Sequence, residues 1–127
     1  MGITKAEALK AVDRERGPVC EASDRIWDQP ETAFQEFHST DVLCELLEKE
    51  GFRVERNLAG IATAFSGTYG SGKPVVGILG EFDALSGLSQ ESESLEKTAL
   101  VDGAPGHGCG HNLLGTGSVA AAIAVKE

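Results

Sequence analysis

Residues 107–111 concentrate the side chains that bind transition metals most readily. They read His107, Gly108, Cys109, Gly110 and His111, and imidazole nitrogen and thiolate sulfur are ligands of zinc and related divalent ions. Side chains two positions apart on an extended backbone face the same way, so Cys109 and His111 can reach one metal or two neighbouring metals. We therefore predict that Cys109 and His111 bind metal. Whether His107 also contacts metal, or only a nearby carbonyl, is left open.

Two carboxylates lie upstream, directly after an apolar run at residues 75–80. That run, bounded by turn residues, predicts a central β-strand buried on both faces. Ligands bind at the carboxyl ends of such strands in open α/β sheets. Glu81 and Asp83 can therefore bind metal, orient another ligand or end the strand in solvent. We predict that Asp83 lies near Cys109 and His111.

Two other kinds of chemistry are weaker interpretations of the same segments. Cys109 and His111 could form a thiol nucleophile and its base, but neighbouring chain positions rarely give that geometry. Gly70, Gly72 and Lys73 suggest a phosphate-binding loop, but Pro74 stands where that motif needs Ser or Thr.

Hydrophobic periodicity and turn residues predict the elements that position these side chains. The last predicted helix is apolar all round, so we expect it to be buried on most sides, and otherwise to cause poor solubility or oligomerisation. The third predicted helix, residues 30–50, has an alternative interpretation, in which residues 39–41 cap a separate helix that begins inside this range. The predicted helices span 4–16, 19–27, 30–50 and 113–126, the last capped by Asn112, and the predicted strands span 52–56, 61–68 and 75–80.

Composition narrows the class of protein. The chain has 127 residues, a formal net charge of −9 and 41% hydrophobic residues. The acidic balance argues against a nucleic-acid partner, and no apolar run is long enough to cross a membrane. Without a secretory signal pattern at its start, the expected location is the cytoplasm. Three cysteines make a poor disulfide framework, and Cys20 and Cys44 are expected to be small buried hydrophobes.

Three sequence blocks together resemble the family of metallopeptidases and amidohydrolases that includes aminoacylases, hippurate hydrolases and carboxypeptidase G. They are residues 26–31 with Glu36, residues 80–90 and residues 103–115. The last block is most similar to the branch that hydrolyses p-aminobenzoyl-glutamate.

The resemblance implies a three-layer αβα zinc-peptidase-like catalytic domain of α/β class, of which residues 1–127 form the N-terminal portion. Cys109 and His111 match metal ligands of a dinuclear zinc or manganese site, and Asp83 matches a residue that supports it. Glu81 stands where other branches have a histidine ligand. The implied substrate is a small N-acyl or N-aroyl amino acid, and the complete enzyme can be a homo- or hetero-oligomer.

Two functions follow as hypotheses. The first is a portion of a metal-dependent amidohydrolase that is inactive alone, because the family's catalytic glutamate, further ligands and dimerisation domain are missing from the chain. The second is a non-catalytic remnant or interaction module that keeps the fold pattern.

Overall fold

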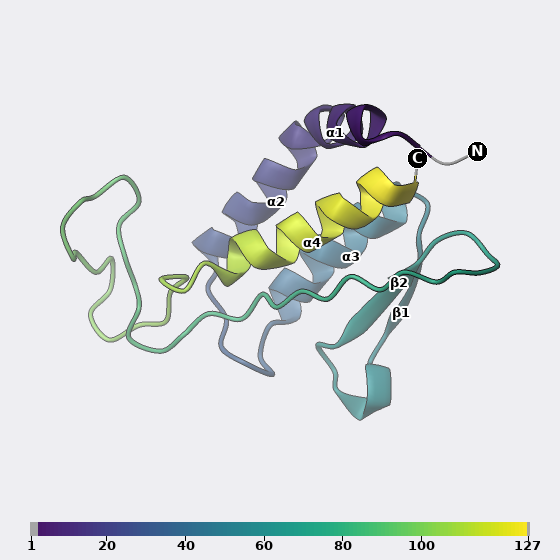
Figure 1. Ribbon diagram of the computed structural model, residues 1–127. Helices are drawn as coiled ribbons and strands as arrows, with labels where there is room; N and C mark the ends of the chain where they lie inside the picture. The colour runs from purple at the N-terminus through teal and green to yellow at the C-terminus, as the bar shows by residue number, and fades with distance from the viewer. Residues whose placement is uncertain (1–2, 127) are drawn as a thin grey trace.

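The structure is a computed structural model that describes residues 3–126. Four α-helices and a small two-stranded sheet are joined by long irregular segments (Figure 1). Between the sheet and the last helix, a long stretch of chain has no regular secondary structure. In chain order the elements are α1 (Lys5–Arg14), α2 (Arg16–Asp28), α3 (Phe37–Lys49), β1 (Arg53–Arg56), the 3₁₀ turn η1 (Leu58–Gly60), β2 (Phe65–Thr68) and α4 (His111–Lys126).

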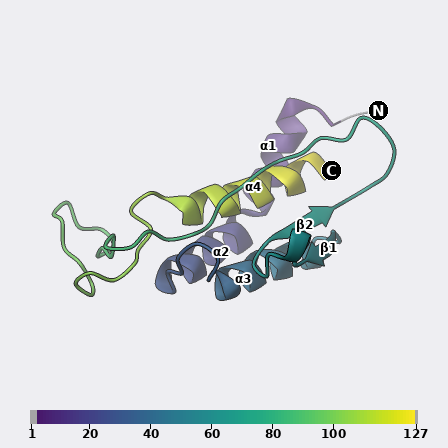
Figure 2. The same ribbon diagram turned by 90° about the horizontal axis from the view of Figure 1, so that it is seen from below.

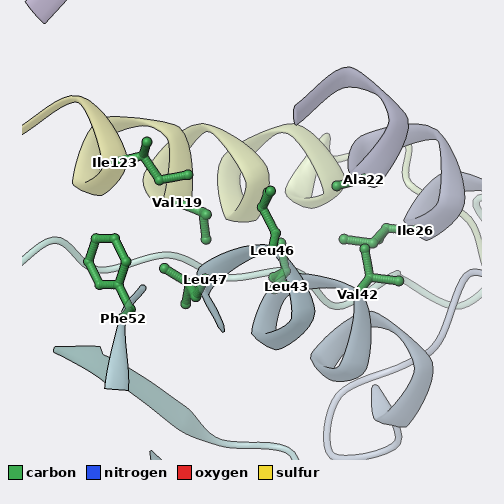
Figure 3. Packing of buried hydrophobic residues seen from close by; sticks show 9 residues of the cluster. All are labelled: Ala22, Ile26, Val42, Leu43, Leu46, Leu47, Phe52, Val119 and Ile123. Carbon is green, nitrogen blue, oxygen red and sulfur yellow. The ribbon is translucent and has the colours of Figure 1, made fainter. Parts of the chain in front are cut away.

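Helices α2, α3 and α4 surround one hydrophobic core, and Phe52 extends it toward the sheet (Figure 3). Ile26, Leu43 and Ile123 contribute one fully buried side chain from each of the three helices. Burial of large aliphatic side chains is the main stabilising contribution to such a core. The cluster consists of Ala22, Ile26, Val42, Leu43, Leu46, Leu47, Phe52, Val119 and Ile123.

The sheet contains two antiparallel strands, with Arg53 paired to Thr68 and Arg56 to Phe65. It lies against α3, where Gly67 approaches Leu47 so closely that an added Cβ would be 2.9 Å from Leu47 Cδ1. The predicted alternation at residues 52–56 is confirmed as strand β1, and the second predicted strand is shorter than expected. Helices with a small sheet are compatible with the predicted α/β class.

The buried central strand predicted at residues 75–80 is wrong for this structure. The segment has no strand hydrogen bonding, and Val75 and Leu79 are 82% and 88% exposed. Within residues 3–126, no other segment pairs with it, and an apolar run cannot form a buried strand without neighbours on both edges. The segment instead runs extended along α4 (Figures 1 and 2), where Ser118 Oγ donates a hydrogen bond to the Leu79 carbonyl at 3.1 Å.

The first two helices lie close to their predicted positions, but Gly17 and Pro18 do not separate them. They fall in the first turn of α2, where backbone N–H groups have no partner within the helix and proline is tolerated. The third helix begins at Phe37 and not at Pro30, because Phe34 adopts a left-handed backbone with φ of 65°. It ends as predicted near Gly51, whose φ is 80°.

Three expectations about burial and capping need correction. Cys44 is buried, as predicted, but Cys20 is exposed. Asn112 lies inside α4 and not before it, and its side-chain amide donates to Ser23 Oγ at 3.0 Å. Helix α4 is buried on one face only, and Leu113 is 65% exposed. Among the helices of residues 3–126, none combines the length and apolar character needed to span a bilayer.

Candidate metal centre

The segment that carries Glu81 and Asp83 is fixed by backbone hydrogen bonds on both sides. The Ala84 N–H donates to the Glu31 carbonyl at 2.7 Å. Leu85 and Gly106 exchange a pair of N–H···O bonds, each 3.0 Å long. These contacts join the loop after Pro30, the segment 81–85 and the glycine-rich loop before α4. They therefore bring together side chains that lie far apart in the sequence.

The loop after Pro30 is itself held in place by Glu31. Its carboxylate accepts hydrogen bonds from the His38 N–H at 2.9 Å, and from the Ser39 N–H and hydroxyl at 2.8 Å each. A carboxylate at a helix N-terminus satisfies unpaired N–H groups and interacts favourably with the helix dipole. Glu31 thus acts on α3 from outside the helix, whereas the sequence suggested that it lies in the first turn.

Close packing of Gly80 against α4 determines where Glu81 and Asp83 lie along the helix. A Cβ at Gly80 would lie 2.9 Å from Ser118 Cβ, and a Cβ at Gly115 would lie 2.9 Å from Phe82 Cβ. Only glycine at both positions allows the segment to approach the helix this closely. The result is that Asp83 reaches the first residue of α4, His111.

The imidazole of His111 is hydrogen-bonded through one ring nitrogen. Its Nδ1 lies 2.8 Å from Asp83 Oδ1 and 3.2 Å from the Asp83 carbonyl oxygen. Both partners are acceptors, so Nδ1 carries the proton, and Nε2 is the ring nitrogen that remains to bind a metal. A carboxylate that orients an imidazole in this way is the usual second partner of a metal-binding histidine.

The free side of the His111 ring faces two further donors. Cys109 Sγ lies 3.4 Å from His111 Nε2, and Glu81 Oε2 lies 3.5 Å from the same nitrogen. Cys109 is exposed and Glu81 is largely exposed, so this side is accessible to solvent. Within residues 3–126, donor atoms of Glu81, Asp83 and His111 lie within 4.8 Å of one another.

This donor set fits a divalent metal ion. Imidazole nitrogen, thiolate sulfur and carboxylate oxygen are the three ligand types of zinc, and a tetrahedral site takes four ligands. Cys109 Sγ and Glu81 Oε2 each approach His111 Nε2, and Asp83 holds the imidazole. These residues supply three direct ligands at most, which leaves room for water or substrate.

His107 lies apart from this group. Only 4% of its surface is exposed, and neither ring nitrogen has a hydrogen-bond partner among the described residues. Burial lowers the pKa of His107, and the nearby His111 acts in the same direction. The backbone of Ile26 and the charge of Asp83 oppose this shift. His107 is therefore a neutral imidazole beside the candidate metal centre, a placement that the sequence left open.

The structure thus brings Asp83, Cys109 and His111 together, with Glu81 as a fourth group. The sequence indicated all four, but it assigned no pairing between His111 and Asp83. It also gave no sign of the burial of His107, since a histidine in a glycine-rich loop is ordinarily exposed.

The loop–helix junction thus defines a candidate divalent-metal centre of carboxylate, imidazole and thiol ligands. No protein-family model matches the chain. A subunit of p-aminobenzoyl-glutamate hydrolase from Escherichia coli (strain K12) is 50% identical to it over 117 residues, which cover 92% of this chain. Xaa-Arg dipeptidase of Homo sapiens is 28% identical over 138 aligned positions, which cover 98% of this chain.

The resemblance predicted from the three sequence blocks, including that to the p-aminobenzoyl-glutamate branch, is therefore confirmed. The chain is similar to proteins named as a hydrolase and a dipeptidase. It spans only 24% and 28% of the lengths of these two relatives, about a quarter of each.

Proposed function

We propose that the chain supplies one wall of the metal centre of an amidohydrolase that cleaves N-acyl or N-aroyl amino acids. The observation that carries this proposal is the convergence of Cys109 Sγ and Glu81 Oε2 on His111 Nε2, with Nδ1 of the same ring held by Asp83. The names of the two relatives support hydrolysis of an amide bond to an amino acid, with p-aminobenzoyl-glutamate as the first substrate to test.

In this proposal His111, Cys109 and Glu81 hold a zinc or manganese ion, and a second ion is bound with ligands from elsewhere. A bound divalent ion polarises the amide carbonyl and lowers the pKa of a water molecule. The chain's own contribution is orientation, because Asp83 keeps the proton on Nδ1 of His111 and so keeps Nε2 available.

The chain corresponds, in this proposal, to part of a three-layer catalytic domain. The exposed apolar segment 75–79 supports this view, because its backbone edges and side chains are suited to a strand with neighbours on both sides. Further chain would complete the sheet and the ligand set. The bacterial relative is named as a subunit, so we extend the proposal to an assembly with other polypeptides.

Metal binding is the first experiment. The metal-free chain is titrated with zinc and with manganese by isothermal calorimetry, and we expect weak binding at one site. Cys109→Ser should weaken zinc binding by about tenfold or more, because thiolate is a strong zinc ligand. Cys20→Ser is the matched control, since Cys20 is also an exposed free cysteine. Equal losses in the two variants would reject the ligand assignment.

Hydrolysis separates the two functional hypotheses. We expect this chain alone, with either metal, to release no more p-aminobenzoate from p-aminobenzoyl-glutamate than Cys109→Ser does, because its ligand set is incomplete. Release that requires Cys109 would show that the chain is catalytic by itself. A chain that binds no metal, but associates through residues 75–79, would favour the alternative of a non-catalytic interaction module.

A further inference from the structure

The loop that carries the candidate metal ligands joins α4 without a side-chain cap. Gly110 precedes the helix with a φ of 82°, and its carbonyl accepts from the Leu113 and Leu114 N–H groups at 3.0 and 3.1 Å. Gly110 therefore stands at the N-cap, and glycine has no side chain to bond the free N–H groups of the first turn. The direction of His111, the first residue of α4, must be fixed by another contact.

Asn112 provides that contact. Its side-chain amide donates to Ser23 Oγ of α2 at 3.0 Å, and the two residues are only 5% and 6% exposed. The Thr116 hydroxyl donates to the Asn112 carbonyl at 2.8 Å, so the same residue is also held from the next turn of α4. The first turn of α4 is therefore tied to α2 directly after His111.

Asn112 occupies a position where helical spacing favours an apolar residue. The Asn112 amide oxygen has no hydrogen-bond partner among the described residues, and a buried unpaired acceptor costs free energy that an apolar side chain of similar size would avoid. Stability alone therefore does not explain the amide. The buried residues of α4 recur three and four positions apart along one face, and they are Asn112, Gly115, Thr116, Val119, Ala120, Ile123 and Ala124.

Specific placement is what a buried polar pair adds to an apolar contact. Helices α2 and α4 share the apolar core, to which they contribute Ile26 and Ile123 (Figure 3), and hydrophobic contacts are non-directional. A hydrogen bond is directional, and one buried amide can specify the register of packed helices. Neighbouring residues of a helix are about 100° apart around its axis, so a rotation of α4 that breaks the Asn112 bond also turns His111 away from Asp83.

We propose that Asn112, held by Ser23, is a positioning residue of the candidate metal centre. It fixes the rotation of the first turn of α4, so that Nδ1 of His111 meets Asp83 and Nε2 is directed toward Cys109. As a contribution to metal binding, this role rests on the function proposed above. As a contribution to the hydrogen bond between His111 and Asp83, it requires no metal.

The test replaces both partners at once. Asn112→Leu with Ser23→Ala removes the bond without leaving a buried polar group alone, so the free energy of unfolding in urea should change little. Zinc affinity, measured by competition with a chromogenic chelator, should nevertheless fall about threefold to tenfold, because direct partners of metal ligands contribute tenfold or more and Asn112 acts one step further away. Thr40→Val is the control, since it removes another buried hydrogen bond between segments, from the Thr40 hydroxyl to the Thr63 carbonyl at 2.9 Å. It should lower the free energy of unfolding and leave zinc affinity unchanged.

A metal-free measurement separates this proposal from the proposed function. In EDTA, at a pH where the imidazole is neutral, ¹⁵N NMR of His111 reports which ring nitrogen carries the proton. The proton should reside on Nδ1 in the unaltered chain, and its share on Nδ1 should fall in Asn112→Leu with Ser23→Ala but not in Thr40→Val. An unaltered chain that binds no zinc would refute the metal centre, and these spectra would still decide the role of Asn112.

Ser23 offers a second pair of variants, should the double variant fold poorly. Ser23→Thr keeps the hydroxyl and should retain both zinc affinity and the proton on Nδ1, whereas Ser23→Ala should lose part of both. The proposal is overturned if removal of the bond leaves zinc affinity and the Nδ1 proton unchanged. It is also overturned by an equal loss in Thr40→Val, which would indicate general destabilisation, or by equal losses in Ser23→Thr and Ser23→Ala, which would mean that the hydroxyl has no part in it.

Discussion

His111 Nδ1 and Asp83 Oδ1 lie 2.8 Å apart, although the two residues are 28 positions apart in the sequence. This single hydrogen bond decides which nitrogen of the imidazole is free. It places Nε2 toward Cys109 and Glu81, at 3.4 and 3.5 Å. The metal affinity of the chain should therefore depend on a residue that need not touch the metal.

Removal of the Asp83 carboxylate should weaken zinc binding about tenfold or more in Asp83→Ala, since partners of metal ligands commonly contribute that much. The zinc affinity of Asp83→Asn should lie between that of the unaltered chain and that of Asp83→Ala, because the amide oxygen of Asn still accepts from Nδ1 but carries no charge. Competition with a chromogenic chelator measures both affinities. Asp102→Ala, on an exposed loop position, is the control, and an effect of Asp83→Ala no larger than that of the control would refute the role.

The close approach of Gly80 to α4 leads to a second prediction. In Gly80→Ala the new Cβ would lie 2.8 Å from Ser118 Oγ and 2.9 Å from Ser118 Cβ, so the segment must move away from the helix. Asp83 is three residues further along that segment. We expect zinc affinity to fall about as far as in Asp83→Ala.

A second substitution should restore what Gly80→Ala removes. Ser118→Gly deletes the atoms that the new Cβ meets, so Gly80→Ala with Ser118→Gly should regain most of the zinc affinity. Ser118→Gly alone should lose helix propensity and the hydrogen bond to the Leu79 carbonyl, together about 1–2 kcal/mol of the free energy of unfolding. If the double variant binds as weakly as Gly80→Ala, crowding against α4 is not the cause.

The three cysteines should react with thiol reagents in a defined order. Burial raises the pKa of the Cys44 thiol to about 11, so thiolate is scarce at pH 8 and access is blocked. Cys20 and Cys109 are exposed and should be alkylated by iodoacetamide first. Mass spectrometry of peptides from the native and urea-unfolded chain checks this order. Zinc should protect Cys109 but not Cys20, and equal protection would contradict the metal site.

Stability should depend on the buried face of α4. Ile123 is 1% exposed within the core cluster, and Ile123→Ala should reduce the free energy of unfolding by about 2–5 kcal/mol. Leu113 on the same helix is 65% exposed, so Leu113→Ala should change it by about 0.5 kcal/mol or less. Urea unfolding followed by circular dichroism compares them. Similar losses would mean that α4 packs through a different face.

Self-association should depend on the exposed apolar segment. Val75 and Leu79 are 82% and 88% exposed, and large exposed apolar side chains promote association. We expect the unaltered chain to associate with rising concentration, and Val75→Lys with Leu79→Lys to remain monomeric. Light scattering coupled to gel filtration measures both. A monomer at all concentrations in the unaltered chain would contradict this expectation.

Local signals in the sequence predicted the helices and the first hairpin strand well. The apolar spacing of α3 and the glycine at position 51 fixed the end of that helix, because both depend on residues within a few positions. The start of α3 was missed, because it depends on the left-handed backbone of Phe34 and on capping by Glu31 from six positions before the helix. Capping from outside a helix leaves no periodic signal.

The sequence by itself determined which side chains are candidate metal ligands, since Cys109, His111 and the two carboxylates are identified by type and spacing. Tertiary structure alone decided that Asp83 holds Nδ1 of His111, that His107 is buried without a partner among the described residues, and that residues 75–79 are exposed. The physical reason is that ligand chemistry belongs to the residue itself. Orientation, burial and strand pairing depend instead on which distant segments lie alongside, such as Gly80 against α4 and Leu85 beside Gly106.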